Sequence, residues 1–167
     1  MTYVLLDIDG VLVTGRDMNR RWREAGRTRP VGRAFDPQAT RNLRRVLERW
    51  PDARVVLNST WRWHPHLKAE LAAALPWLAD RMIGDTPHDA VRPEDAVRAW
   101  RERHPDAAFV CVDDSAAGLI AAHGETHVVL TSHATGFSRR CARQLSRKLG
   151  DFSCKLVSAH TCPSGLP

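Results

Sequence analysis

The chain has 167 residues, of which 43% are hydrophobic and 26% charged, and its 25 Lys and Arg against 19 Asp and Glu give a formal charge of +6. This length suits one domain with a sizeable core, and no apolar stretch is long enough to span a membrane. The N-terminal segment lacks a secretory signal pattern, because Asp7 and Asp9 interrupt its apolar run. We therefore expect a cytoplasmic protein with one domain over 1–150 and a partly ordered tail over 151–167.

Nearly all of the positive charge is Arg, which binds phosphate through two parallel hydrogen bonds. A phosphate-bearing or nucleic-acid partner is one interpretation, and a compositional bias without a ligand is the other. The four cysteines contain no CxxC pair. Cys154 and Cys162, on either side of His160, match no common zinc spacing, so we expect an unremarkable tail in a reducing compartment.

The first predicted element is a strand within residues 4–11, VLLDIDGV. Its apolar run is too short for a helix and is typical of a strand buried on both faces of a parallel sheet. Asp7 and Asp9 come at its C-terminal end, where open α/β sheets place their ligands. Two carboxylates there indicate a site, although a capped turn would use the same residue types.

The later elements alternate between helices and strands. Residues 14–35 are rich in Arg and Gly and predict a loop or flap over the site, with a short helical or hairpin piece over 19–25. Asp36 and Pro37 predict a helix start, as N-cap and first residue, and Pro51 predicts its end. Further strands are expected at 54–57, 81–83, 107–112 and 127–130, and further helices at 65–75, 93–104, 115–122 and 137–149. This order predicts an α/β fold, a three-layer Rossmann-like sandwich around a central parallel sheet.

Polar clusters follow three of the predicted strands. They are Asp7 with Asp9, Ser59 with Thr60, and Asp113 with Asp114. Because the carboxyl ends of parallel strands lie at one edge of a sheet, these side chains can meet. Several carboxylates in one place repel one another unless a cation is bound, and oxygen ligands suit Mg²⁺. The sequence therefore predicts a magnesium site with hydroxyls beside it, suited to holding a phosphoryl group.

The three segments VLLDIDGV, VVLNSTWR and FVCVDDS, in this order, resemble motifs I, II and IV of the haloacid dehalogenase (HAD) superfamily of phosphohydrolases. Together with IGDTP, an Arg ahead of the AVRAW segment, and TSHATGFS, they are similar to the HAD domain of Swiss Army Knife RNA repair proteins. The resemblance covers about residues 2–149. It implies a HAD-like fold and a phosphoric monoester hydrolase that works through an aspartyl-phosphate.

The resemblance also implies roles for individual residues. Asp7 would be the nucleophile, and Asp9 would protonate the leaving oxygen and then deprotonate water. Ser59 matches the motif II hydroxyl, with Thr60 as the second choice. Arg92 fits the basic residue of motif III better than Arg98 or Lys68 does.

The magnesium ligands implied in the same way are the Asp7 carboxylate, the Asp9 main-chain carbonyl and Asp113, with Asp114 in support. Gly10, Thr60 and Arg62 are the expected substrate contacts. Trp61, Arg62 and Trp63 could stack on a base and hold a phosphate, whereas Trp after a strand is more often a core residue.

The intervals between the motifs leave no room for a folded cap domain. Capless relatives tend to accept large substrates, so we expect a nucleotide or polynucleotide phosphate, such as an RNA or DNA end, with RNA-repair proteins as partners. A phosphatase of small phosphate esters and a non-catalytic phosphate- or RNA-binding module are the alternatives. A receiver-type signalling domain fits less well, because receivers place their paired acids on the first strand and the acceptor on a later one.

Overall fold

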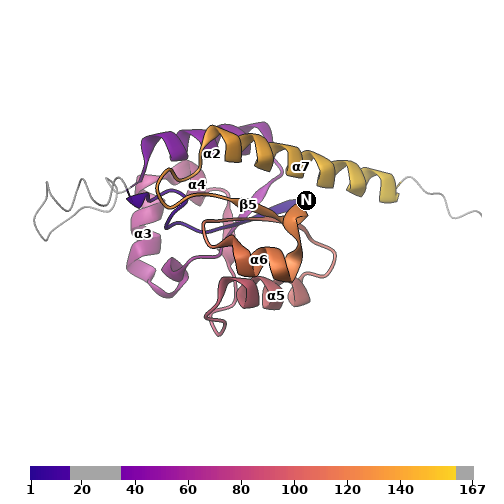
Figure 1. Ribbon diagram of the computed structural model, residues 1–167, viewed down its shortest axis with the longest axis horizontal. Helices are drawn as coiled ribbons and strands as arrows, with labels where there is room; N and C mark the ends of the chain where they lie inside the picture. Colours follow the sequence, from indigo (N-terminus) through magenta and orange to yellow (C-terminus); the bar gives the residue numbers. More distant parts are fainter. Residues whose placement is uncertain (16–34, 161–167) are drawn as a thin grey trace, which may run out of the picture.

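A five-stranded, all-parallel sheet forms the centre of the computed structural model, which describes residues 1–15 and 35–160 (Figure 1). The strand order is β3-β2-β1-β4-β5. The strands are β1 (Thr2–Leu6), β2 (Arg54–Leu57), β3 (Met82–Asp85), β4 (Ala108–Asp113) and β5 (Val128–Leu130). The predicted α/β fold with a parallel sheet is confirmed.

The central strand β1 pairs with β2 on one side and with β4 on the other. Leu6, its last residue, lies beside Leu57 and Val112. The three strands therefore end level with one another, and the residues that follow them leave the sheet at the same edge. This register brings the predicted site residues together.

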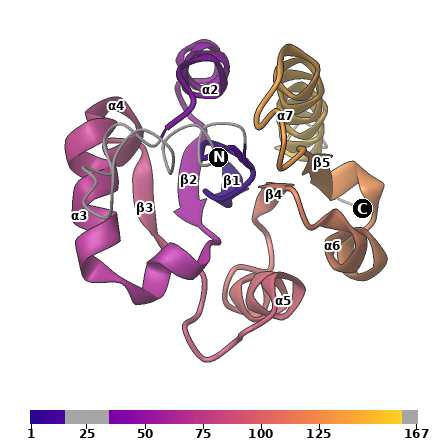
Figure 2. The same ribbon diagram turned by 60° about the vertical axis from the view of Figure 1, so that its left-hand side comes forward.

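Helices cover both faces of the sheet, which gives three layers (Figure 2). Helices α2 and α7 lie on one face, α5 and α6 lie on the other, and α3 and α4 flank the β3 side. Their bounds are α2 (Pro37–Arg49), α3 (Pro65–Ala74), α4 (Pro76–Ala79), α5 (Pro93–Arg103), α6 (Ala116–His123) and α7 (Arg139–His160), with 3-10 helices η2 (Thr60–Trp63) and η3 (Glu125–His127).

Strands β1, β2, β4 and β5 each contribute to two hydrophobic cores, because successive side chains point to opposite faces of a sheet. Leu6 and Val112 pack in the core under α2 and α7, whereas Leu5 and Cys111 pack in the core over α5 and α6. Since both faces are covered, the strands are almost wholly apolar, as the sequence pattern predicts.

The predicted start of α2 is confirmed. Asp36 caps the helix, and its Oδ1 accepts hydrogen bonds from the main-chain N–H of Gln38 (2.7 Å) and of Ala39 (2.9 Å). The carboxylate satisfies two donors that have no partner within the first turn.

Some element bounds differ from the predictions. Helix α7 continues to His160, past the predicted end at 149, and β3 covers Met82–Asp85 instead of 81–83. The short helix α4 was not predicted. The predicted flap lies largely outside the described residues, since 16–34 are not among them. In the described part of the chain, no helix combines the length and the apolar character that crossing a membrane requires.

Candidate active site

Three carboxylates meet at the edge where β1 and β4 end. One carboxylate oxygen from each of Asp7, Asp113 and Asp114 lies within 4.8 Å of the others, and we call these three residues the acidic cluster. Asp7 is fixed by its main-chain N–H, which donates to the Val112 carbonyl at 3.0 Å. Asp113 is the last residue of β4 and is buried. The predicted meeting of the first and third polar strand ends is confirmed.

Burial makes this cluster electrostatically costly. It raises the pKa of Asp7 to about 8, and the charge of Asp113 adds to the shift while a hydrogen bond from Ser59 opposes it. Burial likewise raises the pKa of Asp113 to about 6, against the hydrogen bond from the Ser115 N–H (2.7 Å). A divalent cation would remove the repulsion, and an all-oxygen donor set fits a hard ion such as Mg²⁺.

The carboxylate of Asp9 is not part of the acidic cluster, and it accepts a hydrogen bond from an indole. The Nε1–H of Trp61 donates to Oδ2 of Asp9 at 3.0 Å. Burial raises the pKa of Asp9, and this hydrogen bond partly offsets the rise because it favours the charged form. Trp61 is buried in the core beneath α2 and α7. It is therefore a core residue, as one of the two sequence interpretations has it, and also a donor to Asp9, which neither interpretation included.

Ser59 combines two roles at the start of η2. Its side chain opposes the rise in the pKa of Asp7 through hydrogen bonding, and it caps η2 by accepting from the Trp61 N–H at 3.4 Å. The side chain is buried, whereas that of Thr60 is exposed. The structure therefore brings Ser59, and not Thr60, against the predicted nucleophile.

Gly10 is held where any side chain would collide with the site. Its φ is +72°, and a Cβ at this position would lie 1.9 Å from Oδ2 of Asp114. Its carbonyl accepts from the Thr131 hydroxyl at 2.9 Å. Glycine is needed here both for the left-handed backbone and for the close approach of Asp114.

Arg62, a predicted substrate contact, lies buried behind the site. Its Nη1 donates to the Ser59 carbonyl (3.0 Å) and its Nη2 to the Ala90 carbonyl (2.5 Å). Its Nε finds no partner among the described residues. Burial lowers its pKa, and the charges of Asp85 and Asp7 oppose this. These hydrogen bonds hold the segment after β2, which carries Ser59, in place.

Each of the three candidates for the motif III cation forms an ion pair with a different carboxylate. Arg92 is the exposed N-cap residue of α5 and pairs with Glu94, whose charge contributes to the raised pKa of Asp113. Lys68 pairs with Asp85 at 2.5 Å, and Arg98 pairs with Asp95 on the surface of α5 at 2.8 Å. Arg92 is thus linked through Glu94 to the surroundings of the acidic cluster.

The loop after β5 supplies two contacts with the acidic cluster. The Thr131 N–H donates to the Asp113 carbonyl at 2.9 Å, and Nδ1 of His133 lies 3.4 Å from Oδ2 of Asp114. The TSHATGFS segment gave a signal for this position, because it follows a predicted strand end. Which of its side chains reaches an acid could not be inferred from spacing.

The assembled edge offers a buried carboxylate, a set of acids that could hold a metal ion, and a second carboxylate with its own hydrogen-bond donor. A sequence model of the HAD domain in Swiss Army Knife RNA repair proteins matches residues 3–142. No curated protein matches the chain, and no solved structure does. The matched residues include all of the sheet except Thr2, the first residue of β1, and the whole acidic cluster. The chain belongs to this family of HAD domains from RNA repair proteins.

Proposed function

We propose that the protein is a Mg²⁺-dependent phosphatase that acts through an aspartyl-phosphate on Asp7, with a nucleotide or RNA-end phosphate as substrate. The observation that carries the proposal is the acidic cluster at the carboxyl edge of β1 and β4. Asp9 lies after β1 and accepts a hydrogen bond from Trp61. A buried, negatively charged site of this kind favours transfer of an anionic group only when the charge of its carboxylates is neutralised.

The acidic cluster would hold the magnesium ion, with Asp7, Asp113 and Asp114 as side-chain donors and the main-chain carbonyl of Asp9 as a further one. The raised pKa values of Asp7 and Asp113 support this fit, because they reflect burial and, to a lesser extent, mutual repulsion, and a cation would stabilise the charged carboxylates against both. Bound there, the ion would neutralise charge on the phosphoryl oxygens.

In the first half of the reaction, an Oδ of Asp7 attacks phosphorus, and the bond from phosphorus to the ester oxygen breaks. Asp9 gives its proton to that oxygen, so the alcohol leaves neutral. Trp61 holds the Asp9 carboxyl in one orientation through the 3.0 Å hydrogen bond. Ser59, hydrogen-bonded to Asp7, lies where its hydroxyl can also contact the transferring group.

In the second half, Asp9 takes a proton from water, and the water oxygen attacks phosphorus. The bond between phosphorus and Asp7 breaks, which releases inorganic phosphate and restores the Asp7 carboxylate and the Asp9 acid. No electron is gained or lost, and no second substrate is needed. The raised pKa of Asp9 supports its role, because it brings the carboxyl nearer to the pH at which it can both give and take a proton.

The lack of an inserted cap between β2 and α5 supports a large substrate. Between β2 and α5 the chain forms only η2, α3, α4 and β3, which pack against the sheet and leave no separate cap in this described interval. The family match to RNA repair proteins supports a phosphorylated RNA end, and the Arg-rich composition is compatible with it.

The test is phosphate release with and without magnesium, from an aryl phosphate and from RNA oligonucleotides with 5′- or 3′-phosphates. Asp7→Asn should abolish release from every substrate. Asp106→Asn, a matched change of an exposed aspartate, should leave release intact. Full activity in the Asp7→Asn protein would refute the mechanism. RNA binding without turnover by the unaltered protein would favour the non-catalytic alternative.

A further inference from the structure

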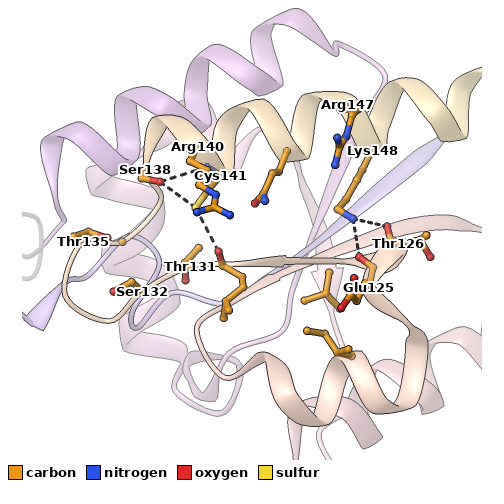
Figure 3. Close-up of a pocket in the computed structure, with 15 residues that line it drawn as sticks. Glu125, Thr126, Thr131, Ser132, Thr135, Ser138, Arg140, Cys141, Arg147 and Lys148 are labelled. Carbon is orange, nitrogen blue, oxygen red and sulfur yellow. Dashed lines mark hydrogen bonds between the residues drawn. The ribbon is translucent and has the colours of Figure 1, made fainter.

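A groove of about 660 Å³ lies beside the acidic cluster, between α7 and the exposed edge of the sheet (Figure 3). We call it the edge groove. Strand β5, which ends the sheet on this side, forms its floor, and α7 forms its wall. Four polar residues of α7 line it, at spacings that place them on one face of the helix: Arg140, Gln144, Arg147 and Lys148.

One end of the edge groove adjoins residues of the proposed active site. Thr131 lines the groove, and it also donates to the Gly10 carbonyl through its hydroxyl and to the Asp113 carbonyl through its N–H. Ser132, the next lining residue, precedes His133, which contacts Asp114. A molecule that fills the acidic cluster and extends past Thr131 would enter the groove directly.

The wall of the edge groove is cationic along its length. Arg140 lies above the Thr131 end, and Arg147 and Lys148 lie above Glu125 and Thr126 at the other end (Figure 3). Neither arginine forms an ion pair with a described carboxylate, and both side chains are exposed. Their guanidinium groups are therefore available to an anion.

The far end of the groove is fixed in place. Nζ of Lys148 donates to the main-chain carbonyls of Glu125 (2.6 Å) and Thr126 (3.2 Å), which ties α7 to η3. Leu130 in the floor is 51% exposed and offers apolar surface beneath the arginines. A row of cations above an apolar floor matches a ligand with a charged backbone and flat apolar groups.

We propose that the edge groove binds the phosphodiester backbone of a single nucleic-acid strand whose terminal phosphate occupies the acidic cluster, with Arg140 and Arg147 on backbone phosphates about three nucleotides apart. The inference rests on the proposed function, and it adds the path of the strand and the residues that hold it. Arg140 and Arg147 are separated by about 10 Å along the helix, at about 1.5 Å per residue. A stacked strand advances about 3.4 Å per nucleotide, so the groove spans about three nucleotides.

A second basic groove provides a matched control. It has a volume of about 340 Å³ on the other side of α7 and carries Arg45, Arg49, Arg139 and Arg143. All of its lining residues belong to α2 and α7, and Thr131 and Ser132 are not among them. It therefore carries more positive charge than the edge groove but lacks the contact with the site.

The first experiment measures equilibrium binding of fluorescent single-stranded RNA, with either a 5′- or a 3′-phosphate, to the full chain carrying Asp7→Asn. Arg140→Ser combined with Arg147→Ser should weaken binding about tenfold or more and lower the slope of log affinity against log salt by about 1.4. Arg45→Ser combined with Arg49→Ser should change the affinity and the salt slope only by the nonspecific effect of removing two positive charges. Affinity should rise with length up to about four nucleotides and then level off.

Equal losses in the two double variants, or an unchanged salt slope in the first, would overturn the edge groove as the strand path. The second experiment compares turnover in chains that retain Asp7. The ratio of kcat/KM for the RNA end to kcat/KM for an aryl phosphate should fall in the edge-groove variant. If the unaltered protein binds RNA through the edge groove but releases no phosphate, the proposed phosphatase activity is refuted, whereas the proposed binding of RNA in the groove is supported.

Discussion

The indole Nε1–H of Trp61 donates to Oδ2 of Asp9 at 3.0 Å, which links a core residue of η2 to the proposed acid–base catalyst after β1. The bond fixes the orientation of a carboxyl group that would have to exchange a proton twice in each cycle. It also favours the charged form of Asp9, against the burial that raises its pKa.

Trp61→Phe should lower kcat for an aryl phosphate about tenfold or more, because a hydrogen bond to a charged group is lost while most of the packing remains. The pKa of Asp9 should rise further, so the alkaline limb of the kcat profile should move to higher pH. Trp63→Phe is the control, because its indole donates instead to the His88 carbonyl at 2.9 Å. An equal effect of both substitutions would show that the contact with Asp9 is unimportant.

Gly10→Ala should lower both stability and metal affinity. A residue other than glycine at φ +72° costs about 1–2 kcal/mol, and its Cβ would also displace the Asp114 carboxylate. Calorimetric titration with Mg²⁺ and thermal unfolding measure the two effects. Gly150→Ala in α7 is the control, since its Cβ would meet Trp50 at an ordinary 3.5 Å. Unchanged Mg²⁺ affinity in the Gly10 variant would contradict the placement of Asp114 in the metal site.

Without magnesium, the free energy of unfolding should fall as pH rises from about 4 to about 8. The folded protein holds protons on Asp7, with a pKa of about 8, and on Asp113, with a pKa of about 6, at pH values where the unfolded chain has lost them. The folded state therefore binds more protons, and stability decreases with pH. Urea titrations at several pH values measure this slope.

Saturating Mg²⁺ should reverse much of that loss, because the ion binds the folded state with its carboxylates charged. Asp7→Asn should flatten the pH dependence of the metal-free protein, since it removes the group with the largest shift. A metal-free protein whose stability is the same at pH 5 and pH 8 would argue against the buried, mutually repelling carboxylates.

Arg92→Ala should lower kcat/KM for the phosphorylated substrate by about tenfold to a hundredfold if Arg92 supplies the motif III cation. Loss of a charge that stabilises a transferring phosphoryl group has an effect of this size or larger. Arg98→Ala on the same helix is the matched control, because Arg98 pairs with Asp95 on the surface. Should the two variants behave alike, Lys68 becomes the better candidate.

Much of the fold could be predicted, because the buried strands appear as short apolar runs and their polar ends are the site. The C-terminal end of helix α7 could not be predicted in this way. The sequence loses its helical period after Leu149, yet the helix continues, with Phe152 packed against the main core and stacked at a tilt on His127 (5.1 Å). That support comes from a distant part of the chain, so local pattern does not contain it.

The same limit applies to the site. The strand ends that carry Asp7, Ser59 and Asp113 were predictable, because a parallel sheet aligns them whatever the details of packing. The contacts of Trp61 with Asp9 and of His133 with Asp114 were not, since each depends on how a helix or loop settles on the sheet. The roles of Arg92, Thr60 and Arg62 stay predictions.

The central position of β1 also has a consequence for how the protein is made. Asp7 is synthesised before its partners in β4, which follow about a hundred residues later. The hydrogen bonds from Thr131 to the Gly10 and Asp113 carbonyls need residues that come after β5. A nascent chain that ends before β4 can pair β1 with β2 and bury Leu6, yet it cannot gather the carboxylates. Pairings so distant in sequence form slowly, so the chain should acquire its affinity for magnesium late in folding, as a marker of completed assembly.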